Sequence, residues 1–185
     1  MVKIYYLDIS ILPSENYDFD GFCEERIRYV NGIKDATRKK QSYYVWKLLL
    51  RALSLLGFDL NAFSFSMNKE GRWIDCSSLV NFSLSHSKNL VCVAICDSEI
   101  SVDVELVSNK IFGVKKLLVG DNTKEGSCDY DEHLLTKKWT IFECQKKLST
   151  IKNTKSFSLL DDNGLTYILS VGNNQIDFDC TLTKL

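Results

Sequence analysis

The hydrophobic positions of this chain recur with the helical period in two long segments. Between about Ala36 and Leu56, apolar residues return every three or four positions, and Gly57 predicts the end of that helix. Residues 129–149 carry acids in the first turn and lysines near the end, which suits the dipole of a second helix. Shorter helices are expected at residues 22–30 and 111–120.

Alternating and continuous apolar runs predict strands in the middle and at both ends of the chain. The clearest pair is LVCVAIC (90–96) and ISVDVEL (100–106). Because only a short polar turn separates them, we expect these two strands to form a hairpin. The polar, glycine-containing stretch 120–128 is expected to be a mobile loop. Further strands are expected at about residues 2–12, 81–85, 155–161, 165–171 and 175–182.

The order of these elements predicts an α+β fold, and two similar α+β halves would fit it. With 45% hydrophobic residues, the 185-residue chain can bury a sizeable core. Its 23 basic and 24 acidic residues leave a net charge of −1, which argues against nucleic acid or an anionic membrane as partner. Seven cysteines without a CxxC pair argue against a disulfide framework, and no apolar run reaches the roughly 18 residues of a membrane span. We therefore expect a cytoplasmic protein.

Two acids stand out in the strand ISVDVEL. Residues two apart on a strand project from the same face, so Asp103 and Glu105 could offer oxygen ligands to one hard cation. Adjacent carboxylates repel each other unless something positive lies between them. The simpler interpretation, in which both acids face solvent on an amphipathic strand, stays open for this strand taken alone.

Two further segments carry residues that could do chemistry. Trp139, Glu143 and Lys147 follow each other at four-residue spacing and so form one stripe on the second long helix. A Glu–Lys pair at this spacing also occurs simply because it stabilises an exposed helix. In NFSLSHS, Ser85 and His86 lie near the end of a strand, where hydroxyl and imidazole groups can bind phosphate.

Together these segments resemble the 4′-phosphopantetheinyl transferase superfamily, and within it the Sfp-type branch of monomeric, two-halved enzymes. That family shows a glycine–lysine–proline turn, then F-x-x-S-H-S, G-[VI]-D-[IVL]-E and W-[TS]-x-K-E-[AS]-x-x-K, in this order. The chain has GRW at 71–73, FSLSHS at 82–87, SVDVE at 101–105 and WTIFECQKK at 139–147. The upstream helix RKKQSYYVWKLLLRAL resembles the family's arginine-led helix, so the similarity covers about residues 38–147.

The resemblance implies an α+β fold of two pseudo-symmetric halves, residues 1–98 and 99–185, each a small, mainly antiparallel sheet packed on a long helix. It implies transfer of the 4′-phosphopantetheine arm of coenzyme A to a serine of an acyl or peptidyl carrier protein, with Mg²⁺ on the pyrophosphate. It implies a monomer. Its implied metal ligands are Asp103, Glu105 and Glu143, and its implied catalytic residues are Glu143, as proton acceptor, and Lys147. Its implied coenzyme A contacts are Arg38, Lys39, Lys40, Arg72, Ser85 and His86.

Several positions depart from the family pattern near the expected site. Phe142 replaces a lysine before the expected metal ligand, Trp73 replaces a proline and Ser101 replaces a glycine. Lys88 replaces a glycine, and Trp46, where a small residue is common, could narrow the adenine pocket. Two alternatives therefore stay open: an inactive relative that binds a carrier protein or coenzyme A, and a metal-dependent phosphohydrolase that uses the same acids.

Overall fold

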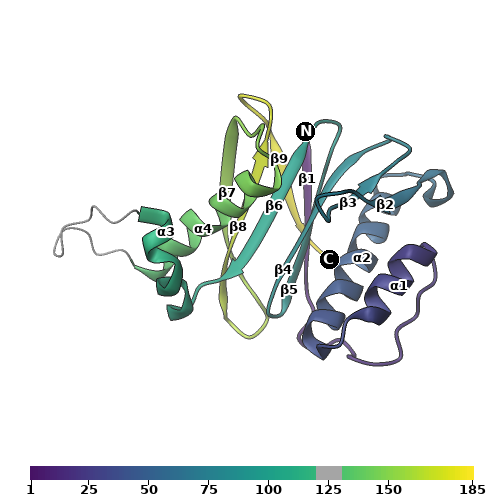
Figure 1. The fold of residues 1–185 in the computed structure, drawn as a ribbon, viewed down its shortest axis with the longest axis horizontal. Helices are drawn as coiled ribbons and strands as arrows, with labels where there is room; N and C mark the ends of the chain where they lie inside the picture. Colours follow the sequence, from purple (N-terminus) through teal and green to yellow (C-terminus); the bar gives the residue numbers. More distant parts are fainter. Residues whose placement is uncertain (120–130) are drawn as a thin grey trace.

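The computed structural model describes residues 1–119 and 131–185 and confirms the predicted α+β class (Figure 1). The predicted loop at 120–128 lies outside the described residues. The helices are α1 (Glu24–Gly32), α2 (Ala36–Leu55), α3 (Lys115–Val119) and α4 (Glu132–Lys147), with short 3₁₀ helices η1 (Leu60–Ala62) and η2 (Asn109–Val114). The strands are β1 (Val2–Asp8), β2 (Phe65–Met67), β3 (Trp73–Asp75), β4 (Asn81–Ser87), β5 (Leu90–Cys96), β6 (Ile100–Leu106), β7 (Asn153–Leu160), β8 (Thr166–Asn173) and β9 (Cys180–Lys184).

The first sheet has four strands in the order β4-β5-β1-β9. Strand β5 is antiparallel to both β4 and β1, whereas β9 runs parallel to β1, so the last strand of the chain lies beside the first. Helix α2 packs on one face of this sheet, where its apolar residues meet Val91, Val93 and Ile95 of β5. The helical spacing of the apolar residues in α2 therefore serves to cover this face.

The second sheet has three antiparallel strands in the order β6-β8-β7, and α4 packs on β6 and β8. The side chain of Asp131 caps α4 by accepting a hydrogen bond from the N–H of Leu134. Further along α4, the hydroxyl of Thr140 lies 2.7 Å from that of Ser170, and the thiol of Cys144 donates to the Ser170 carbonyl at 3.2 Å. This helix is thus held against the sheet through small polar groups.

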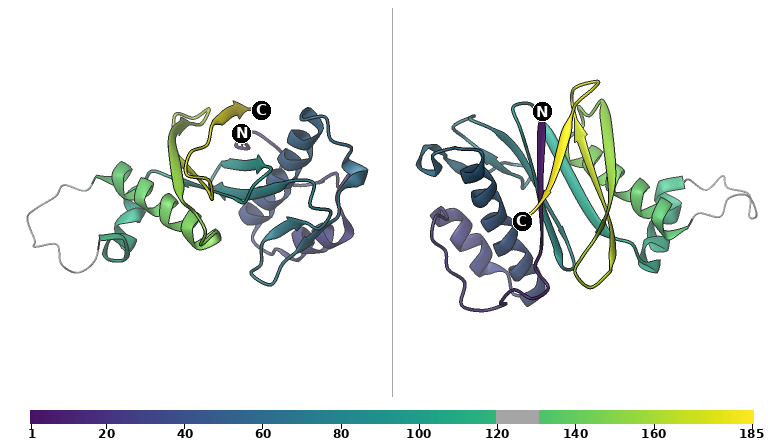
Figure 2. Two further views of the ribbon diagram at one scale, coloured as in Figure 1. Left: turned by 90° about the horizontal axis from the view of Figure 1, so that it is seen from above. Right: turned by 180° about the vertical axis from the view of Figure 1, so that it is seen from behind.

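The two sheets pack against each other through a second apolar core. Val2 and Ile4 of β1 and alternate residues of β5 meet Val102 and Val104 of β6 in this core. Seen from above in Figure 2, the strands lie between α1 and α2 on one side and α4 on the other. Within the described residues, no helix has both the length and the apolar character needed to cross a membrane.

Two sequence predictions about these elements are wrong in detail. Residues 90–96 and 100–106 are strands β5 and β6, but they belong to different sheets and form no hairpin. The reason is that β4 and β1 already pair with the two edges of β5, so the chain after Asp97 has no free edge of β5 beside it. The helix expected at 111–120 is instead the end of η2 followed by α3.

Candidate functional site

Strands β4 and β6 meet at the junction of the two sheets through side-chain hydroxyls. Alternate residues of β4 are serines whose hydroxyls face β6, and alternate N–H groups of β6 point at them. The N–H groups of Val102, Val104 and Leu106 donate to the hydroxyls of Ser83, Ser85 and Ser87, at 3.0, 3.2 and 3.1 Å respectively. The N–H groups at this edge of β6 are therefore satisfied by serine side chains.

Asp103 projects from β6 into this junction and contacts two of the other predicted site residues. Its Oδ1 accepts a hydrogen bond from Ser85 Oγ at 2.9 Å and forms an ion pair with Lys147 Nζ at 2.7 Å. The same ammonium donates to the Val102 carbonyl at 2.8 Å. The structure thus brings together one residue from each of the three motifs, on β4, β6 and α4.

The surroundings of Asp103 act on its negative charge in two opposite directions. Burial raises the pKa of this carboxyl, and the nearby charge of Glu143 raises it further, while Lys147 and Ser85 lower it. With only 11% of its side chain exposed, Asp103 depends on Lys147 as its counter-charge. A second cation placed at this carboxylate would be electrostatically favourable for the same reason.

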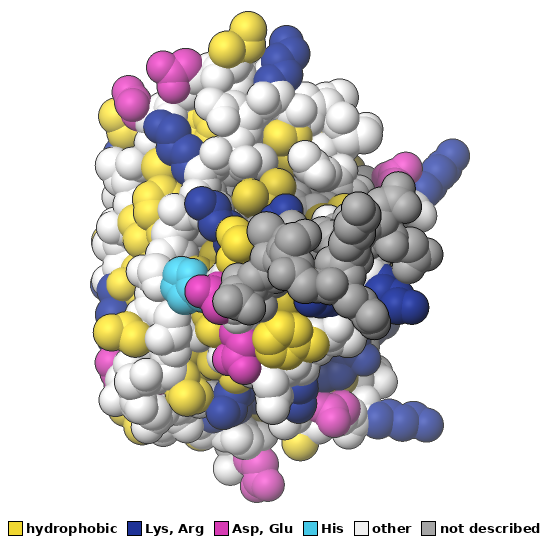
Figure 3. Space-filling model, turned by 90° about the vertical axis from the view of Figure 1, so that its left-hand side faces the viewer, with side chains coloured by type: hydrophobic (Ala, Val, Ile, Leu, Met, Phe, Trp, Pro, Cys, Tyr) yellow, Lys and Arg dark blue, Asp and Glu magenta, His cyan; other side chains and the backbone are white. Residues whose placement is uncertain are grey.

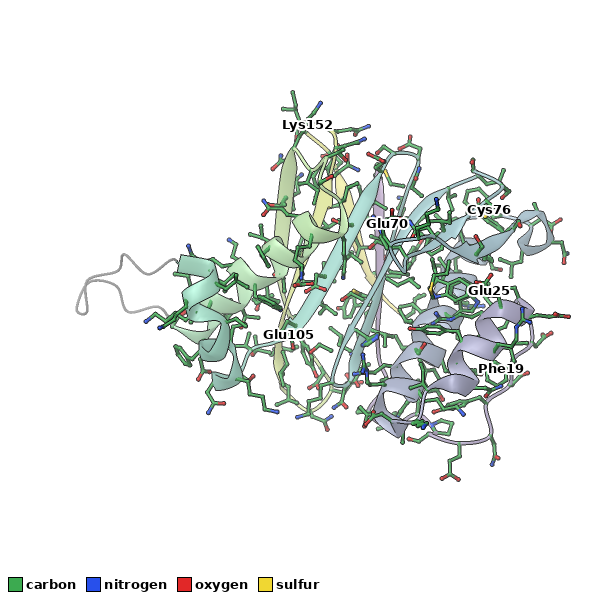
Figure 4. All side chains as sticks on the ribbon, in the orientation of Figure 1. Phe19, Glu25, Glu70, Cys76, Glu105 and Lys152 are labelled. Carbon is green, nitrogen blue, oxygen red and sulfur yellow. The ribbon has the colours of Figure 1, made fainter. Side chains whose placement is uncertain are left out.

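Glu105 lies on the same face of β6, two residues further along, and is labelled in Figure 4. Its Oε1 accepts hydrogen bonds from Ser87 Oγ at 2.5 Å and from the N–H of Leu106 at 3.1 Å. Burial raises the pKa of Glu105, and the charge of Asp103 adds to this shift. None of the ion pairs within the described residues includes Glu105, so this half-buried acid is open to an external cation.

Glu143 is placed less favourably for the predicted metal site. It forms an ion pair with Lys146 at 3.1 Å, one helical turn along α4. The described part of the chain contains no group of three carboxylate, histidine or cysteine side chains placed to hold one metal ion. Asp103 and Glu105 nevertheless supply two carboxylates from one strand, the kind of ligand that Mg²⁺ takes together with substrate phosphates and water.

His86 points to the opposite face of β4 and lines a pocket of about 650 Å³. The pocket lies between the end of α1, the turn after it and the start of α2. Arg28, Lys34 and Arg38 also line it together with one acid, Asp35, so the net charge of its lining is positive. Because Ser85 faces the acids, the structure separates two residues that were both predicted to bind coenzyme A: His86 lines this pocket and Ser85 contacts Asp103.

The pKa of His86 is lowered to about 4, first by partial desolvation of its ring and then by Lys147, Arg38 and Arg26, which repel its charged form, although the residue stays exposed to solvent. The ring is therefore neutral at pH 7 and donates a single N–H group. The positive charge of the pocket comes from its arginine and lysine side chains, and His86 contributes a neutral hydrogen-bond donor to it.

The buried, positively charged side chain of Arg26 lies next to this pocket. Only 2% exposed, it donates to the carbonyl and hydroxyl oxygens of Ser42, a pocket residue, at 2.6 and 2.9 Å. Its guanidinium lies over the rings of Trp46 and Trp73, with its carbon 4.7 and 5.0 Å from their centroids. Burial lowers the pKa of Arg26 to about 10, so it stays charged at pH 7.

The other residues predicted to bind coenzyme A lie in different places. Arg38 lines the pocket with His86, whereas Lys40 lines a separate, smaller one and donates to the Ser10 carbonyl at 3.4 Å. Lys39 is not among the residues lining either pocket. Arg72 donates to the carbonyls of Lys147 and, at 3.2 Å, Ile100, so its guanidinium ties the β2–β3 turn to the end of α4.

A second large pocket, of about 660 Å³, includes one of the acids in its lining. Glu105 and Ser87 line it together with Ile111, Trp139 and Lys110. It has a mixed apolar and basic lining. Glu105 therefore lies where an extended ligand in this pocket would meet the carboxylates.

The positions that depart from the family pattern have structural explanations here. Trp46 is fully buried in the core, where it packs on Trp73, and does not line the pocket of His86. Ser101 is also fully buried and pairs with Gly172 on β8, whose missing side chain leaves space for it. Phe142 packs against Trp139, with ring centroids 5.8 Å apart. These residues are part of the packing around the site.

Three cations of this region were not predicted from the sequence. Arg28 and Lys34 line the basic pocket, and Arg26 donates to the Ser42 carbonyl beside it. The alternation of serines in NFSLSHS could have indicated a polar face on that strand, but its partner could not be read from the sequence. A scan of protein-family models and a search of curated proteins found no match to this chain.

Proposed function

We propose that this protein is a 4′-phosphopantetheinyl transferase that moves the phosphopantetheine arm of coenzyme A to a serine of a carrier protein. The observation that carries this proposal is the contact of Ser85, Asp103 and Lys147 at 2.9 and 2.7 Å. These residues belong to three separate segments that were selected from the sequence as motifs of one family. Their meeting in space is the arrangement that such an enzyme needs.

The topology supports the two-halved arrangement of that family. One half would comprise β1, α2, β4 and β5, and the other β6, α4, β7 and β8. In the sheet order β4-β5-β1 and in β6-β8-β7, the first strand of each unit pairs with its third, and the third pairs with its second. Both units are antiparallel, and each has its long helix on the outer face.

Coenzyme A would bind across the junction of the two sheets. The basic pocket with Arg38 and His86 suits the phosphates of the nucleotide, and the pocket with Trp139 and Ile111 suits the pantetheine arm. The acids of β6 then lie between these two parts of the ligand. This position is consistent with a pyrophosphate at Asp103 and Glu105.

In the proposed reaction, the hydroxyl oxygen of the carrier serine attacks the β-phosphorus, and the bond from that phosphorus to the bridging oxygen breaks. Adenosine 3′,5′-bisphosphate leaves with the electron pair of that bond. Glu143 accepts the serine proton, and Lys147 neutralises charge on the transferring phosphate. Mg²⁺, held by Asp103, Glu105 and the pyrophosphate, would supply further charge neutralisation.

The direct test is incubation of the protein with coenzyme A, Mg²⁺ and a panel of apo carrier proteins. Mass spectrometry of each carrier should show the gain of one phosphopantetheine group, and chelation of the metal should prevent it. If no carrier gains the group although coenzyme A binds, the transferase proposal is wrong. Cleavage of coenzyme A without a carrier would instead favour a phosphohydrolase.

One observation favours a second candidate, a relative that binds coenzyme A or a carrier without transferring the arm. Lys147 is already paired with Asp103, and Glu143 with Lys146, so two of the three predicted metal ligands are engaged in ion pairs within the protein. Phe142 also stands where the family has another cation. A binding measurement with coenzyme A, made beside the transfer assay, separates the two candidates.

Replacement of Arg38 by alanine tests the basic pocket. A hydrogen bond to a charged group contributes about 1.5–3 kcal/mol, so the affinity for coenzyme A should fall by roughly 10-fold to 100-fold. Calorimetric titration with coenzyme A and with its 3′-dephospho form would measure this. Lys39→Ala, one residue away and outside the pocket, is the matched control. Equal losses in the two variants would contradict the placement of the nucleotide.

The carrier protein would approach on the side of η2 and α3, where basic and apolar side chains both reach the surface (Figure 3). Lys110, Lys115 and Lys116 lie on this side, together with the exposed Phe112 and Leu117. Such a surface suits an acidic, partly apolar helix of the carrier.

A further inference from the structure

Ser85 and Ser87 each make two hydrogen bonds to β6, one to a backbone N–H group and one to an acidic side chain of that strand. Each hydroxyl accepts from an N–H group of β6, that of Val104 or of Leu106, at 3.2 and 3.1 Å. Each also donates to a carboxylate, Ser85 to Asp103 at 2.9 Å and Ser87 to Glu105 at 2.5 Å. Asp103 and Glu105 therefore each accept a hydrogen bond from a different serine.

The direction of these bonds follows from the chemistry of the groups. A hydroxyl has one hydrogen, and a backbone N–H can only donate, so each serine must accept from β6. This leaves its hydrogen for the carboxylate, which can only accept when ionised. Both serines are 8% exposed, so water offers little competition for these bonds.

We propose that Ser85 and Ser87 are positioning residues that hold the carboxylates of Asp103 and Glu105 in one orientation toward the substrate. The orientation itself stands on the hydrogen bonds, whereas its consequence for turnover rests on the proposed transferase function. Among the side-chain contacts of the described residues, loss of Ser85 would leave Asp103 with Lys147, and loss of Ser87 would leave Glu105 with the N–H of Leu106.

Ser83 provides a matched control within the same strand. Its hydroxyl accepts from the N–H of Val102 at 3.0 Å, and it is buried to a similar degree at 5% exposure. Among the hydrogen bonds of the described residues, none joins Ser83 to a carboxylate. Ser83→Ala therefore removes the same contact to β6 as the other two variants, and nothing from the acids.

The first measurement compares crystal structures and melting temperatures of Ser83→Ala, Ser85→Ala and Ser87→Ala. The melting temperatures of Ser83→Ala and Ser85→Ala should fall because each variant leaves one buried N–H group without its serine acceptor, whereas that of Ser87→Ala should fall less because the N–H of Leu106 keeps its bond to Glu105. The carboxylate of Asp103 should reorient or become disordered only in Ser85→Ala, and that of Glu105 only in Ser87→Ala. Unchanged carboxylates in both variants would overturn the proposal, whatever reaction the protein catalyses.

The second measurement is the rate of phosphopantetheine transfer. A misplacement of about 1 Å can cost on the order of 100-fold in rate, so kcat should fall by roughly 10-fold to 100-fold in Ser85→Ala and Ser87→Ala. The KM for coenzyme A should change little, since its nucleotide would lie on the other face of β4, and Ser83→Ala should stay within about twofold of wild type. An equal kcat loss in Ser83→Ala would show a structural role only. If the wild-type protein transfers nothing, the proposed function fails while the crystal structures still decide the positioning role.

Discussion

Lys147→Met should both destabilise the protein and abolish phosphopantetheine transfer. The variant keeps most of the side-chain volume but leaves Asp103, 11% exposed, without its cation. Loss of one partner from a fully buried ion pair costs about 3–5 kcal/mol. Because Lys147 is 26% exposed, we expect a smaller loss here, about 2 kcal/mol in the free energy of unfolding, measured by urea denaturation at pH 7.5.

The loss should depend on pH in a defined direction. Burial raises the pKa of Asp103 above its ordinary value of 3.8, and Lys147 is the main group that lowers it, so the pKa is higher still in the variant. A carboxyl whose pKa is raised by folding destabilises the folded state as the pH rises through that pKa. The deficit of Lys147→Met relative to wild type should therefore shrink when the same measurement is made at pH 5.

Lys146→Met is the matched control for this variant. Lys146 is the neighbouring residue on α4, but its side chain is 57% exposed. Its ion pair with Glu143 joins residues three apart on the same helix. Such exposed pairs contribute at most about 0.5 kcal/mol. Equal destabilisation by the two variants would contradict the role given to the pair of Lys147 and Asp103.

Asp103→Asn should slow the reaction strongly but destabilise the protein less than Lys147→Met does. The amide keeps the shape of the side chain but removes the charge that would face Mg²⁺, so transfer should fall on the order of 100-fold to 1000-fold. Lys147 would lose its partner, yet its aliphatic stem lets the ammonium reach water, so the folded state loses less than in Lys147→Met. Both quantities are measurable on one preparation, by transfer kinetics and urea denaturation.

The control for Asp103→Asn is Asp162→Asn. Asp162 also pairs with a lysine, Lys184, at 2.5 Å, but its side chain is 56% exposed and the pair joins the β7–β8 turn to β9. This variant should transfer at the wild-type rate. Full activity of Asp103→Asn would remove the proposed cation site and leave the binding-only candidate as the better explanation.

Local patterns in the sequence were sufficient for most elements of the fold. Strands β4, β5, β7 and β8 and the helices α1, α2 and α4 all lie where periodicity predicted them. The hairpin between β5 and β6 was predicted wrongly because a short polar turn is equally compatible with a crossing to another sheet. Which edge of β5 is free depends on β1, more than 80 residues away along the chain.

The candidate site shows the same division between local and distant information. Periodicity placed Asp103 and Glu105 on one face of a strand, and Glu143 and Lys147 on one stripe of a helix. It could not show that Lys147 would pair with Asp103, since that contact joins α4 to β6. The ion pair of Glu143 with Lys146, by contrast, is a local contact between residues three apart on one helix, which helical spacing does allow.

The sequence by itself therefore determined most of the secondary structure, the α+β class and the identity of the residues able to do chemistry, because these depend on neighbours within a few positions. Only the tertiary structure decided the roles of the serines in NFSLSHS. The pleat of β4 turns Ser85 toward Asp103 and His86 toward the basic pocket, so adjacent residues serve opposite faces of one sheet. Which face meets the acids was set by the packing of the two sheets, a choice made by burial of apolar side chains from both ends of the chain.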